Sequence, residues 1–548
     1  MVVKIKFDLE KFILALFFTI LLFIGPGSVF DHRIMHGFPY GYYASDAFQH
    51  QVRAESIKDM GNFRYEAFYI AQGFEKTIGR YPPLIYHLSV IFSYLSGLEV
   101  YDSIYFIVFF FAVTGIMVMY IIIRNFNKTV AIMSLPLTML TFSHPTLIGF
   151  TWGHWPSLLA QFFLILFIWC ITMIDLKKSY VLVAISLSAI ALTHTSEFVF
   201  ALIFLALFFA VRLASGNLGK TEAKSIIIGF ILSFVLSLWY LIIFKYTWAA
   251  GQPYSFFVMP VWEGNPGFYI IDFGILLVFI IAGILFSLSK LKNMHASLIA
   301  AFAMLLSGFL NYIGFDTRAF QIRFFWPIYL SVFFGFGAYI LLKFVIKKWN
   351  AVLAIAVLAV FVILLLGLVK LPLVPHYTKS TSPGIMDPYH WSALKWVSGN
   401  TEPNSKVYFF YGDIYSQDAL LRNSKRLHFQ VDPDSFVNAI NERKVKKVYT
   451  SELPGDGGGG ITVRKGLFDF EPAIDVLKHE VFFGPQDICR FDYIIFDKVS
   501  RQEVLAKYNL LIANEMLAKG AQRVFENEVV VVLKNNNVGG DCIEERNF

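Results

Sequence analysis

Apolar stretches of about 20 residues recur through the first two thirds of the chain, separated by short polar segments. A helix of this length crosses the roughly 30 Å hydrocarbon core of a bilayer, where no water can satisfy unpaired backbone groups. The pattern therefore predicts an all-α polytopic membrane domain over residues 1–375. We expect about eleven membrane-spanning helices, near residues 11–28, 103–123, 129–148, 156–174, 179–193, 196–213, 225–245, 269–289, 294–314, 324–344 and 351–371.

The charges in the loops predict how these helices are oriented. Short loops such as "RNFNK", "DLKK" and "KFVIKKWN" carry lysine and arginine, which mark the cytoplasmic side of a membrane. Their alternation with aromatic-rich loops requires residues 82–98 to form an interfacial helix within a long first outer loop, residues 29–102. We therefore expect a multi-pass plasma-membrane protein with a cytoplasmic N-terminus and an extracytoplasmic C-terminal region.

The C-terminal region, residues 376–548, is more polar and predicts a small α/β domain. The segments "SKVYFFYG", "KVYTS" and "DYIIFDKV" are typical of strands, "RQEVLAKYNLLIANEMLAKG" of a helix, and "RVFENEVVVVLK" of one further strand. The expected fold class is thus a polytopic helical membrane domain followed by a small extracytoplasmic α/β domain.

The composition supports the membrane class and limits the partners. Of the 548 residues, 57% are hydrophobic and 16% are charged, against about 25% charged in soluble domains. The net charge of +7 follows from the basic loops, so we expect membrane lipids and no nucleic acid as partners. Cys170 lies in an apolar stretch and is expected to pack there. Cys489 and Cys542 could pair if their region is extracellular, and the sequence leaves this open.

A polar cluster, "SDAFQHQVR", follows the first apolar stretch. Asp46, His50 and Arg53 are spaced four and three residues apart, so on a helix they share one face. Such a carboxylate at the membrane surface could act as general base for an acceptor hydroxyl or amide. With other oxygen ligands, Asp46 could also bind a divalent cation such as Mg²⁺ or Mn²⁺. By spacing alone, a solvated helix face with an i,i+4 ion pair is the favoured interpretation.

Two further arginine-bearing segments suit a lipid phosphate. Arg80 opens "RYPPLIYH", in which two prolines fix an extended turn before an apolar helix. Arginine forks match phosphate oxygens, although an interfacial anchor is the alternative for Arg80. "GFDTRAFQIRFFWP" places Asp316, Arg318 and Arg323 at an outer helix boundary, against the positive-inside trend. A lipid phosphate would satisfy these arginines, and so would snorkelling or pairing with Asp316.

Other ionisable residues are candidates for lining such a site. His194 and Glu197, in "LTHTSEF", lie between two apolar helices, where ionisable groups favour function. His154, in "TWGHWP", stands between Trp152 and Trp155, which are most simply an aromatic belt at the interface. The start of the first outer loop adds Asp31, His32 and His36.

These segments together resemble the GT-C class of integral-membrane glycosyltransferases. The run from Asp46 to Arg53 resembles the Asp-x-x-aromatic-His-x-x-Arg pattern in the first outer loop of oligosaccharyltransferase catalytic subunits of archaea and bacteria. "HWSALKWVSGNTEP" is similar to the "ALxWLRENTP" stretch that opens their outer domain. The chain lacks their Trp-Trp-Asp-Tyr-Gly motif, since the matching place reads "FFYGD" (409–413), and its second outer loop reads Gly153-His154-Trp155 without an acid.

The resemblance implies an enzyme, and the departures narrow it. A transferase that moves a sugar from a polyprenyl-phosphate donor, such as a dolichyl phosphate, fits better than transfer to Asn-x-Ser/Thr. The implied roles are a catalytic base for Asp46 with His50 beside it, and inversion at the anomeric carbon. The donor phosphate would be bound by Arg53, Arg80, Arg318 and Arg323. The acceptor would be a glycan, a lipid or a protein, and the source an archaeon or a bacterium.

Two other functions compete with this interpretation. A lipid-linked-glycan transporter would carry ionisable groups in mid-helix and an internal repeat, whereas the charges here lie mostly at helix boundaries. A non-catalytic scaffold of the same fold in surface-glycan assembly is favoured by the missing acid of the second outer loop. The variant Asp46→Ala separates this scaffold from the enzyme.

Overall fold

The structure is a computed structural model of the 548-residue chain. It describes residues 8–29, 32–62, 64–70, 75–79, 81–142, 146–174, 176, 178–247, 276–290, 293–309, 325–348, 384–410, 420–428, 448–450, 462–465, 470–472, 479–481, 485–498 and 503–544.

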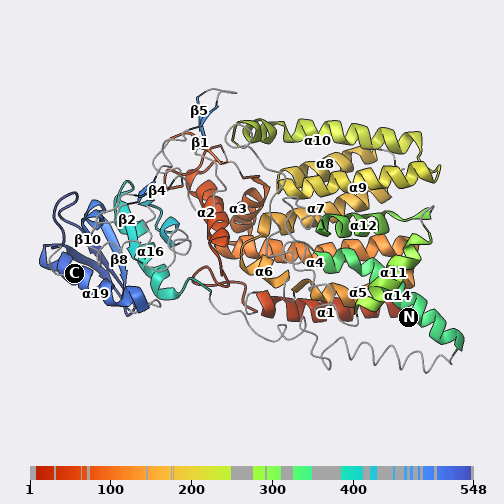
Figure 1. Cartoon of the computed structure of the whole chain (residues 1–548), viewed down its shortest axis with the longest axis horizontal. Helices are drawn as coiled ribbons and strands as arrows, with labels where there is room; N and C mark the ends of the chain where they lie inside the picture. Colours follow the sequence, from red (N-terminus) through yellow and green to blue (C-terminus); the bar gives the residue numbers. More distant parts are fainter. Residues whose placement is uncertain are drawn as a thin grey trace, which may run out of the picture.

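A bundle of roughly parallel helices forms the membrane domain (Figure 1). Six of the described helices are long and apolar enough to cross a bilayer. They are α1 (Leu9–Val29), α4 (Val100–Phe126), α7 (Trp155–Thr172), α9 (Thr195–Ala214), α10 (Lys220–Thr247) and α14 (Trp326–Lys348). Shorter apolar helices complete the described bundle, namely α5 (Lys128–Thr138), α8 (Ser179–Ala191), α11 (Leu276–Leu288) and α12 (Ala296–Phe309). The polytopic helical prediction is confirmed, and the expected helix 351–371 lies outside the described residues.

The expected helix 129–148 is broken into pieces. Helix α5 ends at Thr138 and is followed by a 3₁₀ turn, η1 (Met139–Phe142), and then by the short α6 (Thr146–Thr151). Pro136 lies in the last turn of α5, where it offers no N–H and its ring crowds the carbonyl four residues earlier. The prediction of one continuous span was therefore wrong at this place.

The two ends of the bundle differ in what they carry. Figure 1 shows α1 starting at one end and the C-terminal domain standing at the other, with α2 (Ser45–Met60) and α3 (Leu84–Ser96) between that domain and the bundle. A helix of α3's length spans about 20 Å and is too short to cross. At the opposite end, Glu10 is buried and pairs with Arg124 and Lys128, which ties α1 to α4 and α5.

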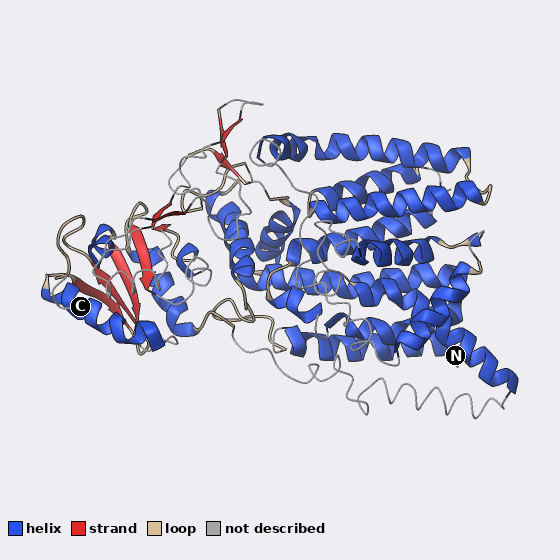
Figure 2. Ribbon diagram, viewed as in Figure 1, coloured by secondary structure: helices blue, strands red, loops and turns tan. Residues whose placement is uncertain are grey.

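The C-terminal domain is a sheet covered by helices on both faces (Figure 2). Five strands have the order β3-β2-β8-β10-β9. Alternate residues of the central strands face α16 (Pro388–Asn400) on one side and α19 (Glu503–Ala518) on the other. The strands are β2 (Lys406–Phe410), β3 (Leu427–His428), β8 (Tyr493–Asp497), β9 (Gln522–Glu526) and β10 (Val530–Lys534). The α/β prediction is confirmed, and Cys489 and Cys542 form a disulfide.

The segment 523–534, expected as one strand, is instead the hairpin β9–β10. Asn527 explains the turn, because its side-chain oxygen accepts the N–H groups of Val529 (3.0 Å) and Val530 (2.7 Å). Its side-chain amide donates to the carbonyl of Tyr389 in α16 (2.9 Å). One asparagine thus closes the hairpin and fastens it to the covering helix.

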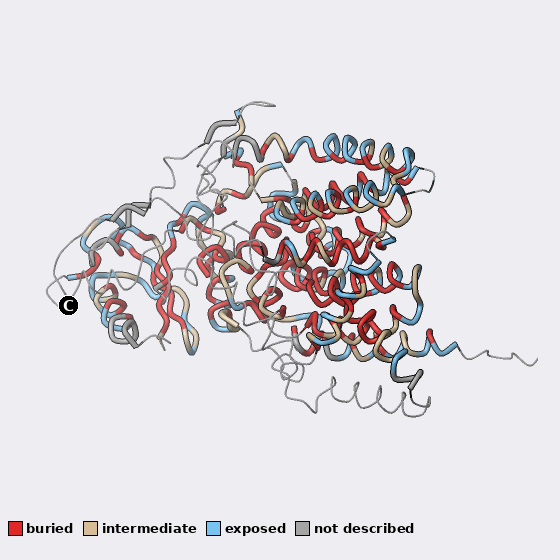
Figure 3. Tube along the Cα trace, turned by 45° about the vertical axis from the view of Figure 1, so that its right-hand side comes forward, coloured by how far each residue is buried: buried red, intermediate tan, exposed pale blue. Residues whose placement is uncertain are grey.

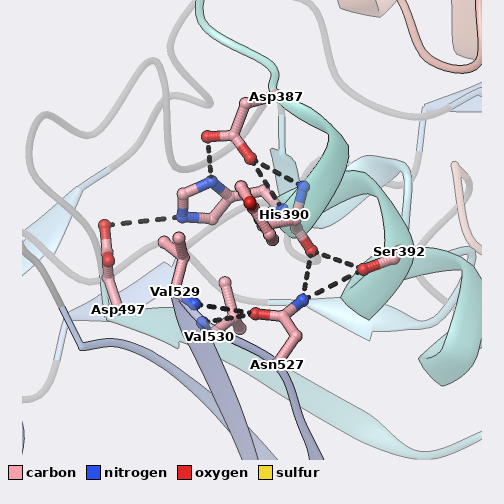
Figure 4. A network of polar contacts seen from close by, with 8 residues as sticks. Asp387, His390, Ser392, Asp497, Asn527, Val529 and Val530 are labelled. Carbon is pink, nitrogen blue, oxygen red and sulfur yellow. Dashed lines mark hydrogen bonds and ion pairs between the residues drawn. The ribbon is translucent and has the colours of Figure 1, made fainter.

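A buried charged network also joins α16 to the sheet (Figure 4). The ring of His390 donates from Nδ1 to Asp387 (2.6 Å) and lies 3.4 Å from Asp497 through Nε2. Burial disfavours the charged ring, but the two carboxylates outweigh burial and raise the pKa of His390 to about 9. Burial likewise opposes ionisation of Asp387, yet the hydrogen bonds from His390 hold the pKa of this carboxyl below its usual value.

Burial follows the same architecture. Buried residues run through the middle of the bundle and along the sheet, whereas exposed residues follow the outer edges (Figure 3). Helix α10 is the clearest case, because Ile231, Phe234, Val235 and Leu238 are all exposed. An apolar exposed stripe of this kind on a membrane helix faces lipid.

Candidate active site

Helix α2 carries the three residues of the first polar cluster. Its residues from Ala47 to Ser56 are all buried, although many are polar, because α2 lies between the bundle and the C-terminal domain. Asp46 is in the first turn, where the partial positive charge of the helix N-terminus favours a carboxylate. The helix ends at Gly61, which adopts the left-handed conformation at φ 63°.

One side of α2 binds the C-terminal domain. Gln51 donates to the side chain of Asn423 (2.9 Å), and Lys425 pairs with Glu55 (3.0 Å) and Asp59 (2.7 Å). Positions 51, 55 and 59 are four residues apart and form one stripe. The opposite side of α2 is thereby left to face the membrane domain.

The loop between α6 (Thr146–Thr151) and α7 rests directly on the start of α2. Gly153 has φ +87°, and a Cβ there would lie 2.2 Å from the backbone nitrogen of Ala47 and 2.7 Å from the carbonyl carbon of Asp46. Only glycine allows this approach. His154 follows and is buried at the start of α7, with its N–H donated to the carbonyl of Gly149 (2.9 Å). The fold therefore brings the loop with His154 to the backbone of Asp46.

Aromatic side chains enclose His50. Its Nδ1 lies within hydrogen-bond distance of the hydroxyl of Tyr86 (2.8 Å). The ring meets Tyr81 edge-on at 5.6 Å and Trp155 at 6.4 Å, measured between centroids. Trp155 is fully buried and donates to the carbonyl of Phe150 (2.6 Å), so the expectation of an interfacial belt was wrong for this tryptophan.

Arg53 is paired with an acid that the sequence did not single out. Its Nη1 donates to Glu66 (2.6 Å), and its guanidinium lies over the ring of Tyr81 at 5.0 Å. The side chain of Arg53 is 8% exposed and that of Glu66 is 19% exposed. A charge-assisted hydrogen bond and an aromatic face together fix the guanidinium.

Arg53 and Glu66 line a pocket of about 240 Å³ between the first outer loop and the membrane helices. Arg64 and His87 also line this pocket, and burial lowers the pKa of His87, which favours the neutral ring. Helix α10 supplies part of the apolar lining through Leu236, Trp239, Tyr240 and Ile243. The pocket therefore joins a buried arginine to a helix that faces lipid.

The predicted pair His194 and Glu197 belongs to a separate polar cluster. Glu197 is fully buried, pairs with His194, and accepts hydrogen bonds from Ser157 (2.6 Å) and Gln161 (3.3 Å) of α7. Tyr329 of α14 donates to the carbonyl of Gln161 (3.2 Å). This network ties three membrane helices together beside the turn that holds Trp155, and it does not line the pocket.

The remaining predicted residues divide into two groups. His36 binds Asp102 of α4 through its N–H (2.8 Å) and its ring (2.7 Å), and His32 lies 2.7 Å from the carbonyl of Phe23, so both fasten the first loop. Arg80 lies outside the described residues. Also outside them are Asp31, Asp316, Arg318 and Arg323.

Comparison with known proteins identifies the fold. No family model and no curated protein sequence matches the chain. Among solved structures, ArnT from Cupriavidus metallidurans bound to undecaprenyl phosphate matches with a TM-score of 0.58 and 12% identity, covering 96% of this chain and 98% of ArnT. The apo oligosaccharyltransferase of Archaeoglobus fulgidus matches with a TM-score of 0.57 and 13% identity, covering 98% of this chain and 76% of that enzyme.

A further structure is AglB from Archaeoglobus fulgidus in complex with an inhibitory peptide and a dolichol-phosphate. It matches with a TM-score of 0.55 and 12% identity, covering 96% of this chain and 75% of AglB. At these identities the likeness establishes the architecture alone. The chain has a GT-C-like fold, as the resemblance implied.

One solved structure of the Archaeoglobus fulgidus oligosaccharyltransferase is a complex with Zn and sulfate. Across the part of this chain that the structure describes, no three His, Cys, Asp or Glu side chains are grouped closely enough to hold a metal ion. The loop that meets Asp46 supplies Gly153 and His154 and no acid. The described residues thus do not compose a metal site.

Proposed function

We propose that this chain is a GT-C glycosyltransferase that transfers a sugar from a polyprenyl-phosphate donor to an acceptor at the membrane face where the C-terminal domain stands. One observation carries the proposal: the pocket connects the buried guanidinium of Arg53 to the lipid-facing helix α10, beside α2, whose first turn holds Asp46. A polyprenyl phosphate needs this combination, because its phosphate is anionic and its tail must stay in lipid.

The donor would bind with its phosphate at Arg53 and its first isoprene units along α10. Arginine binds phosphate oxygens through two parallel N–H groups, and Glu66 already occupies one of these donors with a carboxylate oxygen. A phosphate oxygen offers the same charge and geometry, so it can take over that position. Arg64 lines the pocket as well, and Arg80, Arg318 and Arg323 stay predicted phosphate ligands.

Asp46 would act as the base. Seven residues separate it from Arg53, or about 10 Å along the helix axis, which leaves room for a sugar ring between phosphate and acceptor. The carboxylate takes the proton of the acceptor hydroxyl while the acceptor oxygen bonds to the anomeric carbon. The bond from that carbon to the phosphate oxygen breaks, and the polyprenyl phosphate leaves with the electron pair. In-line displacement inverts the anomeric centre.

The acceptor and its side of the membrane are part of the proposal. A glycan, a lipid or a protein with a free hydroxyl or amide would approach from the side of the C-terminal domain. The disulfide Cys489–Cys542 favours an oxidising, extracytoplasmic space for that domain. The basic ends of α4 and α5, near Arg124 and Lys128, favour the cytoplasm for the opposite end of the bundle.

A second candidate is a non-catalytic scaffold of the same fold. It is favoured by the loop Gly153-His154, which meets Asp46 without an acid. A scaffold would keep the lipid pocket and would tolerate the loss of the Asp46 carboxylate.

Binding and transfer measurements separate these functions. Undecaprenyl phosphate and dolichyl phosphate should bind the purified full-length protein in detergent, whereas the matching polyprenols without phosphate should bind far more weakly. Arg53→Ala should weaken phosphate binding about tenfold or more, in line with a charged hydrogen bond, and Arg490→Ala, at an exposed arginine, should not. Asp46→Asn should keep binding and lower transfer by about 10²- to 10⁴-fold. Transfer that survives Asp46→Asn would remove Asp46 as base, and no phosphate binding by the wild type would remove the proposal.

A further inference from the structure

A hairpin of the C-terminal domain reaches back to the pocket. Strands β5 (Thr462–Arg464) and β6 (Phe470–Pro472) form a three-stranded sheet with β1 (Thr77–Ile78) of the first outer loop. Figure 1 shows β1 and β5 together near the end of α10. Ile78 pairs with Thr462, and Ile78 lines the pocket. A strand nearly 400 residues further along the chain therefore helps to frame a pocket of the membrane domain.

Arg464, the last residue of β5, touches the wall of the pocket itself. Its guanidinium lies over the indole of Trp239 at 4.9 Å, and Trp239 lines the pocket from α10. The backbone N–H of Arg464 donates to the carbonyl of Lys76 (3.1 Å), next to β1. One residue of the C-terminal domain thus connects the lipid-facing helix to the first outer loop.

A second line of contacts leads from the same hairpin to Arg53. Strand β5 holds β1 in register, and Thr77 of β1 accepts the backbone N–H of Glu66 (3.0 Å). The side chain of Glu66 in turn holds the guanidinium of Arg53. The strand pairing therefore fixes the position of the acid that orients the phosphate-binding arginine.

We infer that Arg464 is a positioning residue of the lipid-phosphate pocket, through which the C-terminal domain sets the place of Trp239 and, by way of β1, that of Arg53. The inference rests on the proposed function, because it takes the pocket as the donor site. It adds that the affinity for the donor depends on a domain that lies outside the membrane.

The experiment measures the affinity of the full-length protein for undecaprenyl phosphate in detergent. Arg464→Ala and Trp239→Leu should each weaken binding by about three- to tenfold, the range expected for one partly buried cation–π contact. Arg464→Lys keeps a cation over the indole and should restore most of the affinity. Lys465→Ala, at the exposed neighbouring residue, should bind like the wild type. The double variant of Arg464→Ala and Trp239→Leu should bind undecaprenyl phosphate no more weakly than the weaker of these two single variants.

The outcomes distinguish this inference from the proposal that it rests on. If the wild type binds undecaprenyl phosphate and Arg464→Ala binds it just as tightly, the inference is overturned and the donor pocket stands. No wild-type binding would overturn the proposed function itself. In a transfer assay, Arg464→Ala should raise the KM for the donor and leave kcat at saturation unchanged. A lowered kcat would mean that Arg464 has a merely structural role and would overturn the inference. The same conclusion would follow if Arg464→Lys did not restore the affinity and the unfolding temperature were lower.

Discussion

Arg53 and Glu66 form a 2.6 Å charge-assisted hydrogen bond inside the pocket that we propose for the donor. The arginine that suits a phosphate is therefore already bound to an anion of the same chain. Glu66 has two effects on a lipid phosphate that approaches Arg53. Its position orients the guanidinium, and its charge competes with the phosphate for that guanidinium.

Substitutions at Glu66 separate these two effects. Glu66→Gln keeps an oxygen acceptor for Arg53 but removes the competing charge, so affinity for undecaprenyl phosphate should rise about tenfold, within the range of one charged hydrogen bond. Glu66→Ala also removes the oxygen acceptor that orients Arg53, so its affinity for undecaprenyl phosphate should rise less. Titration of lipid phosphate into the purified variants measures both. Glu402→Gln, at an exposed acid of the C-terminal domain, is the control and should change nothing. Weaker binding of undecaprenyl phosphate by Glu66→Gln would show that the charge of Glu66 does not compete with the phosphate for Arg53.

The contact between Gly153 and the start of α2 predicts a steric effect on the site. Gly153→Ala adds a Cβ 2.2 Å from the backbone nitrogen of Ala47, so α2 and Asp46 must shift. We expect transfer to fall by at least about tenfold, since small misplacements of catalytic groups are costly. Transfer rates and unfolding temperatures of the variant measure this effect.

Gly97→Ala provides a matched control. Gly97 also has a positive φ, +73°, but nothing lies within 4 Å of its added Cβ. The variant Gly97→Ala should therefore show only the backbone strain of an alanine in this conformation, about 1–2 kcal/mol. Equal losses of transfer in the two variants would show that the contact with Ala47 carries no weight.

The sequence predicted the membrane helices and the common face of Asp46, His50 and Arg53 because both follow from local spacing. Runs of apolar residues must become helices in lipid, and a spacing of four and three residues fixes a helix face. Its errors were also local. Pro136 ended a helix that hydropathy alone extended, and the Asn527 turn divided a strand that β-propensity alone continued.

The partners of the site were beyond sequence reasoning because they are distant along the chain. Arg53 meets Glu66 within one loop, but the pocket wall comes from Trp239 and the frame from Arg464. A tryptophan in an apolar helix and an arginine after a glycine-rich segment carry no signal of mutual contact. Only the folded chain places them at one pocket.

The buried network around His390 predicts how stability depends on pH. The pKa of His390 is raised to about 9 in the folded chain, against about 6.5 in the unfolded chain. The network therefore contributes its full stabilisation of the folded state below pH 6.5. This stabilisation, up to about 3 kcal/mol, is lost as the pH rises towards 9. Asp387 has a lowered pKa, so its contribution is present above about pH 4 and is lost as the pH falls further.

Thermal unfolding of the full-length protein between pH 4 and pH 9.5 measures this dependence. The wild type should be most stable between about pH 4 and pH 6.5 and should lose stability on the alkaline side. His390→Gln removes the titrating ring and should flatten the alkaline limb, at the cost of lower stability near pH 6. An alkaline limb that persists in His390→Gln would assign it to other groups.

Lys425 predicts how firmly the C-terminal domain holds α2. Its ammonium pairs with Glu55 and Asp59, and the charges of these two acids raise its pKa although burial opposes this. Lys425→Ala leaves both acids without this cation, and we expect hydrogen exchange in residues 51–60 to rise about tenfold or more.

The comparison is Lys519→Ala, which removes an exposed pair with Glu544 elsewhere in the C-terminal domain. Exposed ion pairs contribute little to stability, so hydrogen exchange in α2 of Lys519→Ala should match that of the wild type. Because Asp46 lies in the first turn of α2, a looser α2 should also lower transfer more than it lowers binding of lipid phosphate. Faster exchange in α2 with unchanged transfer would show that the proposed base keeps its place without the C-terminal domain. Unchanged exchange in Lys425→Ala would mean that Gln51–Asn423 and the Tyr42–Gly384 bridge suffice to hold α2.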